Sequence, residues 1–207
     1  MGELLHVLIA CEESQRVCQA FRDLGHIAYS CDILPTSGIH EEWHIQGDFR
    51  DHLNGWDLII GHPPCTYLCN SGVGWLIRDG KFNQDRLEKL QEAHNLFYDL
   101  LNADCEKICV ENPIPHKYAR LPKYTQIIHP WQFGCMEQKP TCLWLKGLPM
   151  LKETNNVREE MKHLPANKRQ RIHYMAPSKD RQKERSRTYP GIAAAMAAQW
   201  GTPQRGA

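Results

Sequence analysis

The sequence predicts an α/β fold in which a mostly parallel β-sheet carries helices on both faces. Short apolar runs, typical of buried strands, occur at residues 4–10, 27–33, 44–49, 57–61, 107–110 and 141–145. Helical patterns occur at residues 14–24, 83–102 and 191–200. Strands that alternate with helices favour parallel pairing, because each crossover places a helix on a face of the sheet.

The first helical pattern has clear predicted ends. Ser14 is the expected N-cap, and Gly25 follows the last periodic residue. Val17 and Phe21 lie on one side of such a helix, and we expect that side to face the sheet.

The length and composition are those of one globular domain. The chain has 207 residues, of which 42% are hydrophobic and 24% are charged. We expect residues 1–149 to form an α/β core and residues 150–187 to form a basic segment. Residues 188–207 are expected to form a closing helix that rejoins the core.

Charge is distributed unevenly along the chain. The net charge is +1, but residues 151–187 hold 11 Lys and Arg against 5 Asp and Glu. The rest of the chain is therefore acidic. A basic segment on an acidic body indicates a contact for a polyanion, although a solvated basic loop would look the same.

The cysteines and the N-terminus favour a cytoplasmic location. The nine cysteines have no framework of repeated spacings, which is typical of thiols kept reduced. We expect no signal peptide and no membrane span. A zinc site built from Cys65, Cys69, Cys105 and Cys109 is conceivable, but Cys109 lies inside an apolar strand, so no metal is expected.

The strongest motif is Gly61-His62-Pro63-Pro64-Cys65, directly after an apolar strand. Two prolines fix the backbone there and give the next side chain a defined direction. Cys65 is therefore a candidate nucleophile, with a buried structural cysteine as the alternative.

A carboxylate is expected beside that cysteine. Glu111 and Asn112 follow another apolar strand and precede Pro113. Carboxyl ends of parallel strands meet at one edge of the sheet, which is where ligands bind. A cysteine beside a carboxylate suits addition to an electron-poor ring, because the acid can hydrogen-bond a ring nitrogen. A glutamate that only caps the next turn is the alternative.

These motifs resemble those of the DNA cytosine-C5 methyltransferase family, and most of all its compact bacteriophage branch. Residues 57–72 are similar to the family's catalytic Pro-Cys motif, and Glu111-Asn112 to its Glu-Asn-Val motif. The resemblance implies a Rossmann-like fold that binds S-adenosylmethionine. It also implies that Cys65, after Pro64, attacks C6 of cytosine, and that Glu111, beside Asn112, contacts N3 and the exocyclic amine.

The resemblance also implies a cofactor site at the strand ends. The family's glycine-rich first loop is replaced here by a loop without glycine, where a helix N-terminus could hold a carboxylate. Asp32 matches the acid that binds the ribose, and Asp48 matches the position that contacts adenine. The residues expected to bind the cofactor are Cys11, Glu12, Glu13, Ser14, Asp32, Ile33, Asp48, Phe49, His62 and Pro63.

DNA is the partner that the resemblance implies. The family's Gln-x-Arg-x-Arg motif, which holds O2 of the base, is replaced by Gln138-Lys139-Pro140-Thr141. We therefore expect Lys139, Thr141, Arg185 or Arg187 to contact O2, and Lys168, Arg169 and Arg171 to contact phosphates. The resemblance implies that residues 1–149 are the catalytic and cofactor-binding core and residues 150–187 a reduced recognition segment. Because that segment is short, we expect relaxed sequence recognition with base flipping. By analogy with phage members, the role would be protection of DNA.

Three other functions stay open at this stage. An amino-methyltransferase would need an aromatic residue where Cys65 stands. An enzyme that methylates free dCMP or dCTP would explain the small size but not the basic segment. A non-catalytic DNA-binding relative would explain the missing glycines but not Cys65 and Glu111. The sequence indicates no obligate protein partner and leaves the oligomeric state undetermined.

Overall fold

The computed structural model describes residues 3–78, 80–178 and 181–202. Residues 179 and 180 of the basic segment and residues 203–207 of the closing segment lie outside the described residues.

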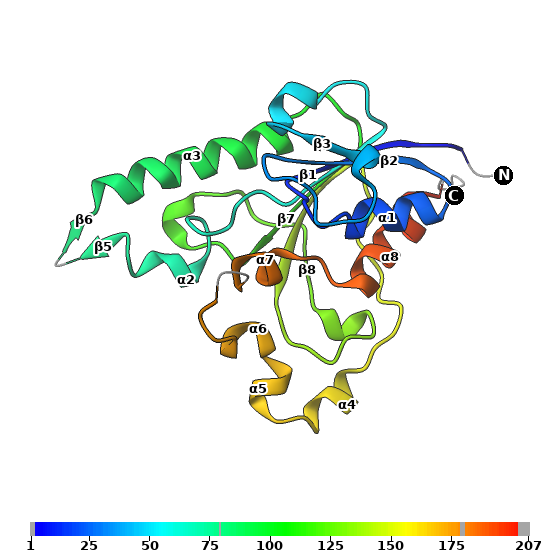
Figure 1. The fold of residues 1–207 in the computed structure, drawn as a ribbon. Coiled ribbons are helices and arrows are strands. Elements are labelled where there is room, and N and C mark those ends of the chain that lie inside the picture. Colours follow the sequence, from blue (N-terminus) through cyan, green and yellow to red (C-terminus); the bar gives the residue numbers. More distant parts are fainter. Residues whose placement is uncertain (1–2, 79, 179–180, 203–207) are drawn as a thin grey trace.

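A seven-stranded sheet forms the centre of the molecule, with strand order β3-β2-β1-β4-β7-β9-β8 (Figure 1). Its strands are β1 (His6–Ala10), β2 (Ile27–Asp32), β3 (His44–Gln46), β4 (Leu58–Gly61), β7 (Ile108–Pro113), β8 (Gln126–Ile128) and β9 (Thr141–Lys146). The first five strands in the order pair in parallel, whereas β9 is antiparallel to both β7 and β8. The predicted Rossmann-like fold with a mostly parallel sheet is confirmed.

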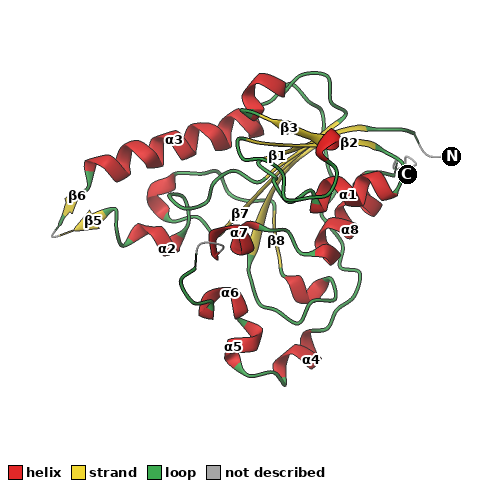
Figure 2. Cartoon of the chain, in the orientation of Figure 1, coloured by secondary structure: helices red, strands yellow, loops and turns green. Residues whose placement is uncertain are grey.

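Helices cover both faces of the sheet (Figure 2). Helices α1 (Arg16–Asp23) and α8 (Pro190–Trp200) pack together on one face, where Phe21 and Trp200 belong to the same buried cluster. Helix α3 (Gln84–Leu101) packs on the other face through Phe97 and Leu100. Side chains alternate along a strand, so Ile9 enters the first cluster and Leu8 the second.

Helix α1 begins differently from the prediction. Ser14 is not its N-cap: that position is Gln15, whose backbone is left-handed with φ 57°. The carboxylate of Glu12 accepts hydrogen bonds from the N–H groups of Val17 and Cys18, at 2.8 and 3.1 Å. Glu12 thus serves the helix N-terminus in place of Ser14. The predicted end at Gly25 is confirmed, because Gly25 has a positive φ of 87°.

Strand β7 is longer than predicted. Glu111 and Asn112 lie inside it, paired with Leu143 and Cys142 of β9. The sequence places polar residues and a proline here, which is typical of a strand end, but the antiparallel neighbour continues the pairing as far as Pro113.

The remaining elements are short. An antiparallel pair, β5 (Ile77–Arg78) and β6 (Lys81–Phe82), follows α2 (Asn70–Val73) and lies at the far end of α3, away from the sheet (Figure 1). Four helices occupy the basic segment: α4 (Arg158–Lys162), α5 (Ala166–Arg169), α6 (Arg171–Tyr174) and α7 (Arg181–Ser186). The described residues also contain four 3-10 turns: η1 (Glu41–Trp43), η2 (Phe49–His52), η3 (Lys117–Ala119) and η4 (Pro130–Gln132).

Candidate active site

The register of the sheet brings the predicted residues to one edge. Ala10 of β1 lies beside Cys31 of β2 and Gly61 of β4, and Gly61 lies beside Val110 of β7. The residues that follow these four are Cys11, Asp32, His62 and Glu111. They form a row along the carboxyl edge, as the parallel pairing predicts.

The Pro-Pro turn is fixed on both sides. His62 donates its N–H to the Ala10 carbonyl at 2.9 Å, and the buried Asn112 amide donates to the Pro63 carbonyl at 2.8 Å. A Cβ on Gly61 would lie 2.6 Å from Leu100, so glycine lets α3 pack closely here. Pro63 is buried and Pro64 is exposed. The turn therefore delivers Cys65 from a backbone held by two neighbouring strands.

His62 and Glu111 form a buried pair above the strand ends. His62 Nδ1 and Glu111 Oε2 are 3.1 Å apart, with side-chain exposures of 7% and 15%. Burial alone would raise the pKa of Glu111, but the hydrogen bond with His62 and the charge of Lys139 outweigh it and lower the pKa. The same contact raises the pKa of His62 despite its burial. Glu111 is therefore a carboxylate that accepts from His62.

Cys65 is half-buried and is held as a thiol. Its pKa is raised, first by the hydrogen bond with Cys69, then by burial and by the negative charge of Glu111, while Lys139 opposes the rise. Cys69 also donates its N–H to the Cys65 carbonyl at 3.0 Å, so the two residues share one helical turn. The thiolate is the nucleophilic form, so attack by Cys65 requires loss of this proton.

The charge of Lys139 acts on this group. Lys139 acts on the pKa of both Cys65 and Glu111, and its Nζ donates to the Arg185 carbonyl at 3.0 Å. Lys139, Thr141 and Arg187 line a small cavity together with Glu111. The Arg185 side chain is exposed. The structure therefore brings Lys139, Thr141 and Arg187 to Glu111.

Four of the residues predicted to bind the cofactor lie at or just after the ends of β2 and β3 and divide into two pairs. Asp32, whose pKa is raised by burial, accepts a hydrogen bond from the N–H of Leu34, and the neighbouring Ile33 is 72% exposed. Both carboxylate oxygens of Asp48, by contrast, accept hydrogen bonds from the guanidinium of Arg50. The ring of Phe49 is buried in the core cluster around α3. Asp32 and Ile33 are thus accessible to a ligand, whereas Asp48 and Phe49 are engaged within the protein.

The loop between β1 and α1 has a left-handed backbone at two residues, although it contains no glycine. Cys11 has φ 58° and Gln15 has φ 57°, and only one other non-glycine residue in the described chain, Arg120, has a positive φ. Such a conformation costs about 1–2 kcal/mol for a residue with a Cβ. The polar side chains of the loop bond to one another: Ser14 donates a hydrogen bond to the Glu12 carboxylate, which is buried.

The basic residues predicted to contact phosphates have different surroundings. Lys168 is exposed, whereas Arg169 is partly buried and its carbonyl accepts the N–H of Gln138 at 2.6 Å. Arg171 forms an ion pair with Glu137 at 2.8 Å, and Glu137 also accepts from the Tyr189 hydroxyl. Arg169 and Arg171 therefore attach the basic segment to the core, in addition to carrying positive charge.

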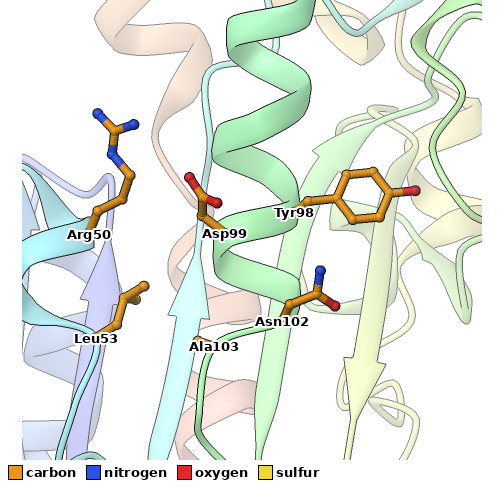
Figure 3. A pocket seen from close by; sticks show the side chains of 6 residues that line it. All are labelled: Arg50, Leu53, Tyr98, Asp99, Asn102 and Ala103. Carbon is orange, nitrogen blue, oxygen red and sulfur yellow. The ribbon is translucent and has the colours of Figure 1, made fainter.

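A second hollow lies away from these residues. It has a volume of about 420 Å³ and is lined by Arg50, Leu53, Tyr98, Asp99, Asn102 and Ala103 (Figure 3). None of the predicted site residues lines it. Within residues 3–78, 80–178 and 181–202, no cluster of His, Cys, Asp and Glu is suited to a metal ion. No helix in this part of the chain is long and apolar enough to cross a membrane.

Three features of the site were missed at the level of sequence. They are the contact of Cys65 with Cys69, the pairing of His62 with Glu111, and the use of Glu12 by its own helix. The four-residue spacing of Cys65 and Cys69 is a signal for the first, because it places both on one side of a helical turn. The other two depend on strand order and on a left-handed residue.

Comparison with known proteins gives structural likenesses alone. No family model matches the chain, and no curated protein sequence matches it. The Entamoeba histolytica methyltransferase EhMeth aligns with a TM-score of 0.47 and 12% identity, over 74% of this chain and 58% of that one. An E. coli prophage protein, named as a DNA modification methyltransferase, aligns with a TM-score of 0.43 and 14% identity, over 78% of this chain and 56% of that one. The S. pombe Dnmt2 methyltransferase aligns with a TM-score of 0.43 and 16% identity, over 86% of this chain and 61% of that one. This chain therefore spans less than two thirds of each of these longer proteins.

Proposed function

We propose that the chain is an S-adenosylmethionine-dependent methyltransferase that acts on C5 of cytosine in DNA, with Cys65 as its covalent nucleophile. One observation carries the proposal: a proline-fixed cysteine lies at the carboxyl edge of the sheet, within electrostatic reach of a buried carboxylate and a lysine. The resemblance of the motifs to those of cytosine-C5 methyltransferases indicates the reaction, which is addition of the cysteine to the cytosine ring.

The reaction begins when the Cys65 thiolate adds to C6 of the base. A bond forms between sulfur and C6, and the electron pair of the C5–C6 double bond moves to C5. C5 is then the nucleophilic carbon of the ring. Bound S-adenosylmethionine would supply an electrophilic methyl group to it and would depart as the neutral thioether. Loss of the C5 proton to a base restores the double bond and expels the Cys65 thiolate.

The His62–Glu111 pair suits the charge that develops on the ring during addition. The Glu111 carboxylate can accept from the exocyclic amine, and the pair shares a proton that N3 can take up. Lys139 is the cation best situated to contact O2, because it already acts on both Cys65 and Glu111. Thr141, which lines the same cavity, is a further donor for the base.

The residues at the neighbouring strand ends fit S-adenosylmethionine, which supplies an electrophilic methyl group when it is bound. Asp32 ends β2 and offers a carboxylate oxygen to the ribose hydroxyls, and the exposed Ile33 side chain offers an apolar surface to the adenine. Asp48 would have to release Arg50 before it could contact the adenine. Ser14 and Cys11 shape the loop beside this site.

DNA is the proposed substrate because the basic segment borders the site. Lys139 contacts the carbonyl of Arg185, so α7 lies next to Glu111, and α5 and α6 continue outward with Lys168, Arg169 and Arg171 (Figure 1). Cations of this kind bind phosphates without reading sequence. The target cytosine must leave the stack to reach Cys65.

Radiolabelled S-adenosylmethionine tests the proposal when it is offered with separate pools of duplex DNA, RNA and dCTP. We expect label in DNA, recovered as 5-methylcytosine after digestion to nucleosides. Cys65→Ala should abolish the label and retain binding of S-adenosylhomocysteine. DNA containing 5-fluorocytosine should form a covalent adduct, because the C5 proton cannot leave.

Each other outcome has a definite meaning. Label on N4 of cytosine or N6 of adenine, or full activity of Cys65→Ala, would exclude the covalent mechanism. Label in dCTP alone would identify a nucleotide-level enzyme. No label with any pool, together with retained DNA binding, would identify a non-catalytic relative.

A further inference from the structure

The N-terminus of α1 is closed to a ligand carboxylate. Both oxygens of Glu12 are already bonded to its N–H groups: Oε1 accepts from Val17 at 2.8 Å and Oε2 from Cys18 at 3.1 Å. Glu12 is 4% exposed, so it cannot readily turn away. An anionic ligand group at this edge of the sheet must therefore bind elsewhere.

The next residue, Glu13, is buried but not satisfied. It is 8% exposed, and neither carboxylate oxygen has a hydrogen-bond partner among the described residues. Its backbone is fixed, because the Glu13 carbonyl accepts from the Thr36 hydroxyl and from the Ser37 N–H, each at 2.9 Å. A buried carboxylate without hydrogen bonds is costly, so Glu13 is ready to accept from a cationic donor.

Two cations stand near Glu13 at distances longer than a charge-assisted hydrogen bond. Lys183 Nζ is 3.5 Å from Oε2, and Arg187 Nε is 4.0 Å from Oε1. Lys183 is 40% exposed and can turn to solvent. Arg187 is held instead: its Nη1 and Nη2 contact Glu184 and Ser37, and the adjoining Thr188 carbonyl accepts from Arg16.

Arg187 has one donor left over. Its Nε is buried and has no hydrogen-bond partner within the described chain. The same side chain lines the small cavity that also contains Glu111 and Thr141. Arg187 thus stands between Glu13 and the proposed base site, with a free N–H beside an unsatisfied carboxylate.

A ligand that carries an ammonium next to a carboxylate matches this pair. We propose that Glu13 binds the α-ammonium, and Arg187 the α-carboxylate, of the amino-acid end of S-adenosylmethionine. This assignment rests on the proposed function and gives Arg187 a role other than contact with O2 of the base. Asp32, at the end of the strand next to β1, is then left for the ribose, and the loop joins the two sites through the Glu12 N–H, which donates to the Cys31 carbonyl at 3.2 Å.

Binding of three ligands to the full chain, measured by calorimetry without DNA, tests the pair. S-Adenosylhomocysteine has the whole amino-acid end, decarboxylated S-adenosylmethionine keeps only the ammonium, and 5′-methylthioadenosine has neither group. We expect Arg187→Gln to weaken S-adenosylhomocysteine about 10- to 100-fold and to leave the other two within twofold. Glu13→Gln should weaken the two ligands that carry the ammonium and spare 5′-methylthioadenosine.

Lys183→Gln is the matched control, because it also removes a positive charge from beside the Glu13 carboxylate. It should leave the affinity for S-adenosylhomocysteine unchanged or raise it. Equal weakening of all three ligands by Arg187→Gln, or equal effects of Lys183→Gln and Arg187→Gln on S-adenosylhomocysteine, would overturn the assignment. So would affinities of Arg187→Gln and Glu13→Gln that stay within twofold of the wild type. If the wild type binds none of the three ligands, the proposed function itself fails.

Discussion

The edge of the sheet and the basic segment hold their polar side chains in opposite ways. At the edge, Glu111 and Asn112 are fixed by strand pairing, and their side chains bond to His62 and Pro63 in the turn that follows β4. In the segment, helices of four to six residues carry exposed cations, and single contacts such as Arg171 with Glu137 attach them to the core. Substitutions at the edge should therefore change chemistry, and those in the segment should change binding.

The largest expected effect is that of Glu111→Gln. The amide keeps the shape of the side chain but removes the negative charge that accepts from His62 and from the base. We expect methyl transfer to fall about 10²- to 10⁴-fold, with DNA affinity nearly unchanged. Single-turnover transfer to DNA and a parallel binding titration measure the two quantities. A loss confined to DNA affinity would place Glu111 outside the chemistry.

Asn112→Ala should affect both stability and chemistry. Removal of the amide leaves the buried Pro63 carbonyl without its donor, which costs about 1–3 kcal/mol in the free energy of unfolding. Transfer should fall as well, since the turn that delivers Cys65 is less constrained. Urea unfolding and single-turnover rates report on this, and a variant as stable as the wild type would show that the hydrogen bond is dispensable.

Cys69→Ala should make Cys65 more reactive. The contact with Cys69 is the main cause of the raised pKa of Cys65, so its loss lowers that pKa and increases the thiolate fraction at a given pH. Alkylation of Cys65 by iodoacetamide, followed by peptide mass spectrometry at pH 8, should accelerate about threefold to tenfold. The wild-type rate should rise with pH and still be rising near pH 9, the ordinary value for a thiol. Cys69→Ser is the control, because its hydroxyl can replace the hydrogen bond, and equal rates in the alanine and serine variants would contradict the explanation.

The smallest effect is expected in the segment. Lys168 is exposed, so Lys168→Gln should lower the slope of log affinity for DNA against log salt by about 0.9 and leave single-turnover transfer at saturating DNA unchanged. Arg171 is a poorer probe, because its loss would also release Glu137 from an ion pair. An unchanged slope would remove Lys168 from the DNA contact.

The sequence predicts most of the sheet because its strands are buried on both faces. Continuous apolar runs mark β1, β2, β4 and β9, and the register then follows from parallel pairing. Strand β8 was missed, since it is only the three residues Gln126–Ile128 at an edge. The length of β7 was underestimated, because its second half is polar and is held by an antiparallel neighbour.

Prediction of the site was limited by geometry that a sequence does not contain. The approach of Glu111 to Cys65 follows from strand ends alone, but the His62–Glu111 bond requires that β4 and β7 be neighbours. Glu12 lies at the expected place and yet its carboxylate turns toward its own helix, because Cys11 and Gln15 reverse the chain. Conformation at these two residues therefore determines that the Glu12 carboxylate bonds to the N-terminus of α1.

The left-handed Cys11 also bears on how such proteins are detected. Glycines in the first loop of such a fold indicate that the backbone is left-handed there. They mark the path of the backbone, and the chemistry of the site does not require glycine itself. A chain that follows the path with cysteine and glutamine, at a cost of about 1–2 kcal/mol for each residue, is missed by a search for those glycines. The backbone path of a first loop is therefore a better criterion for such a loop than its glycine content.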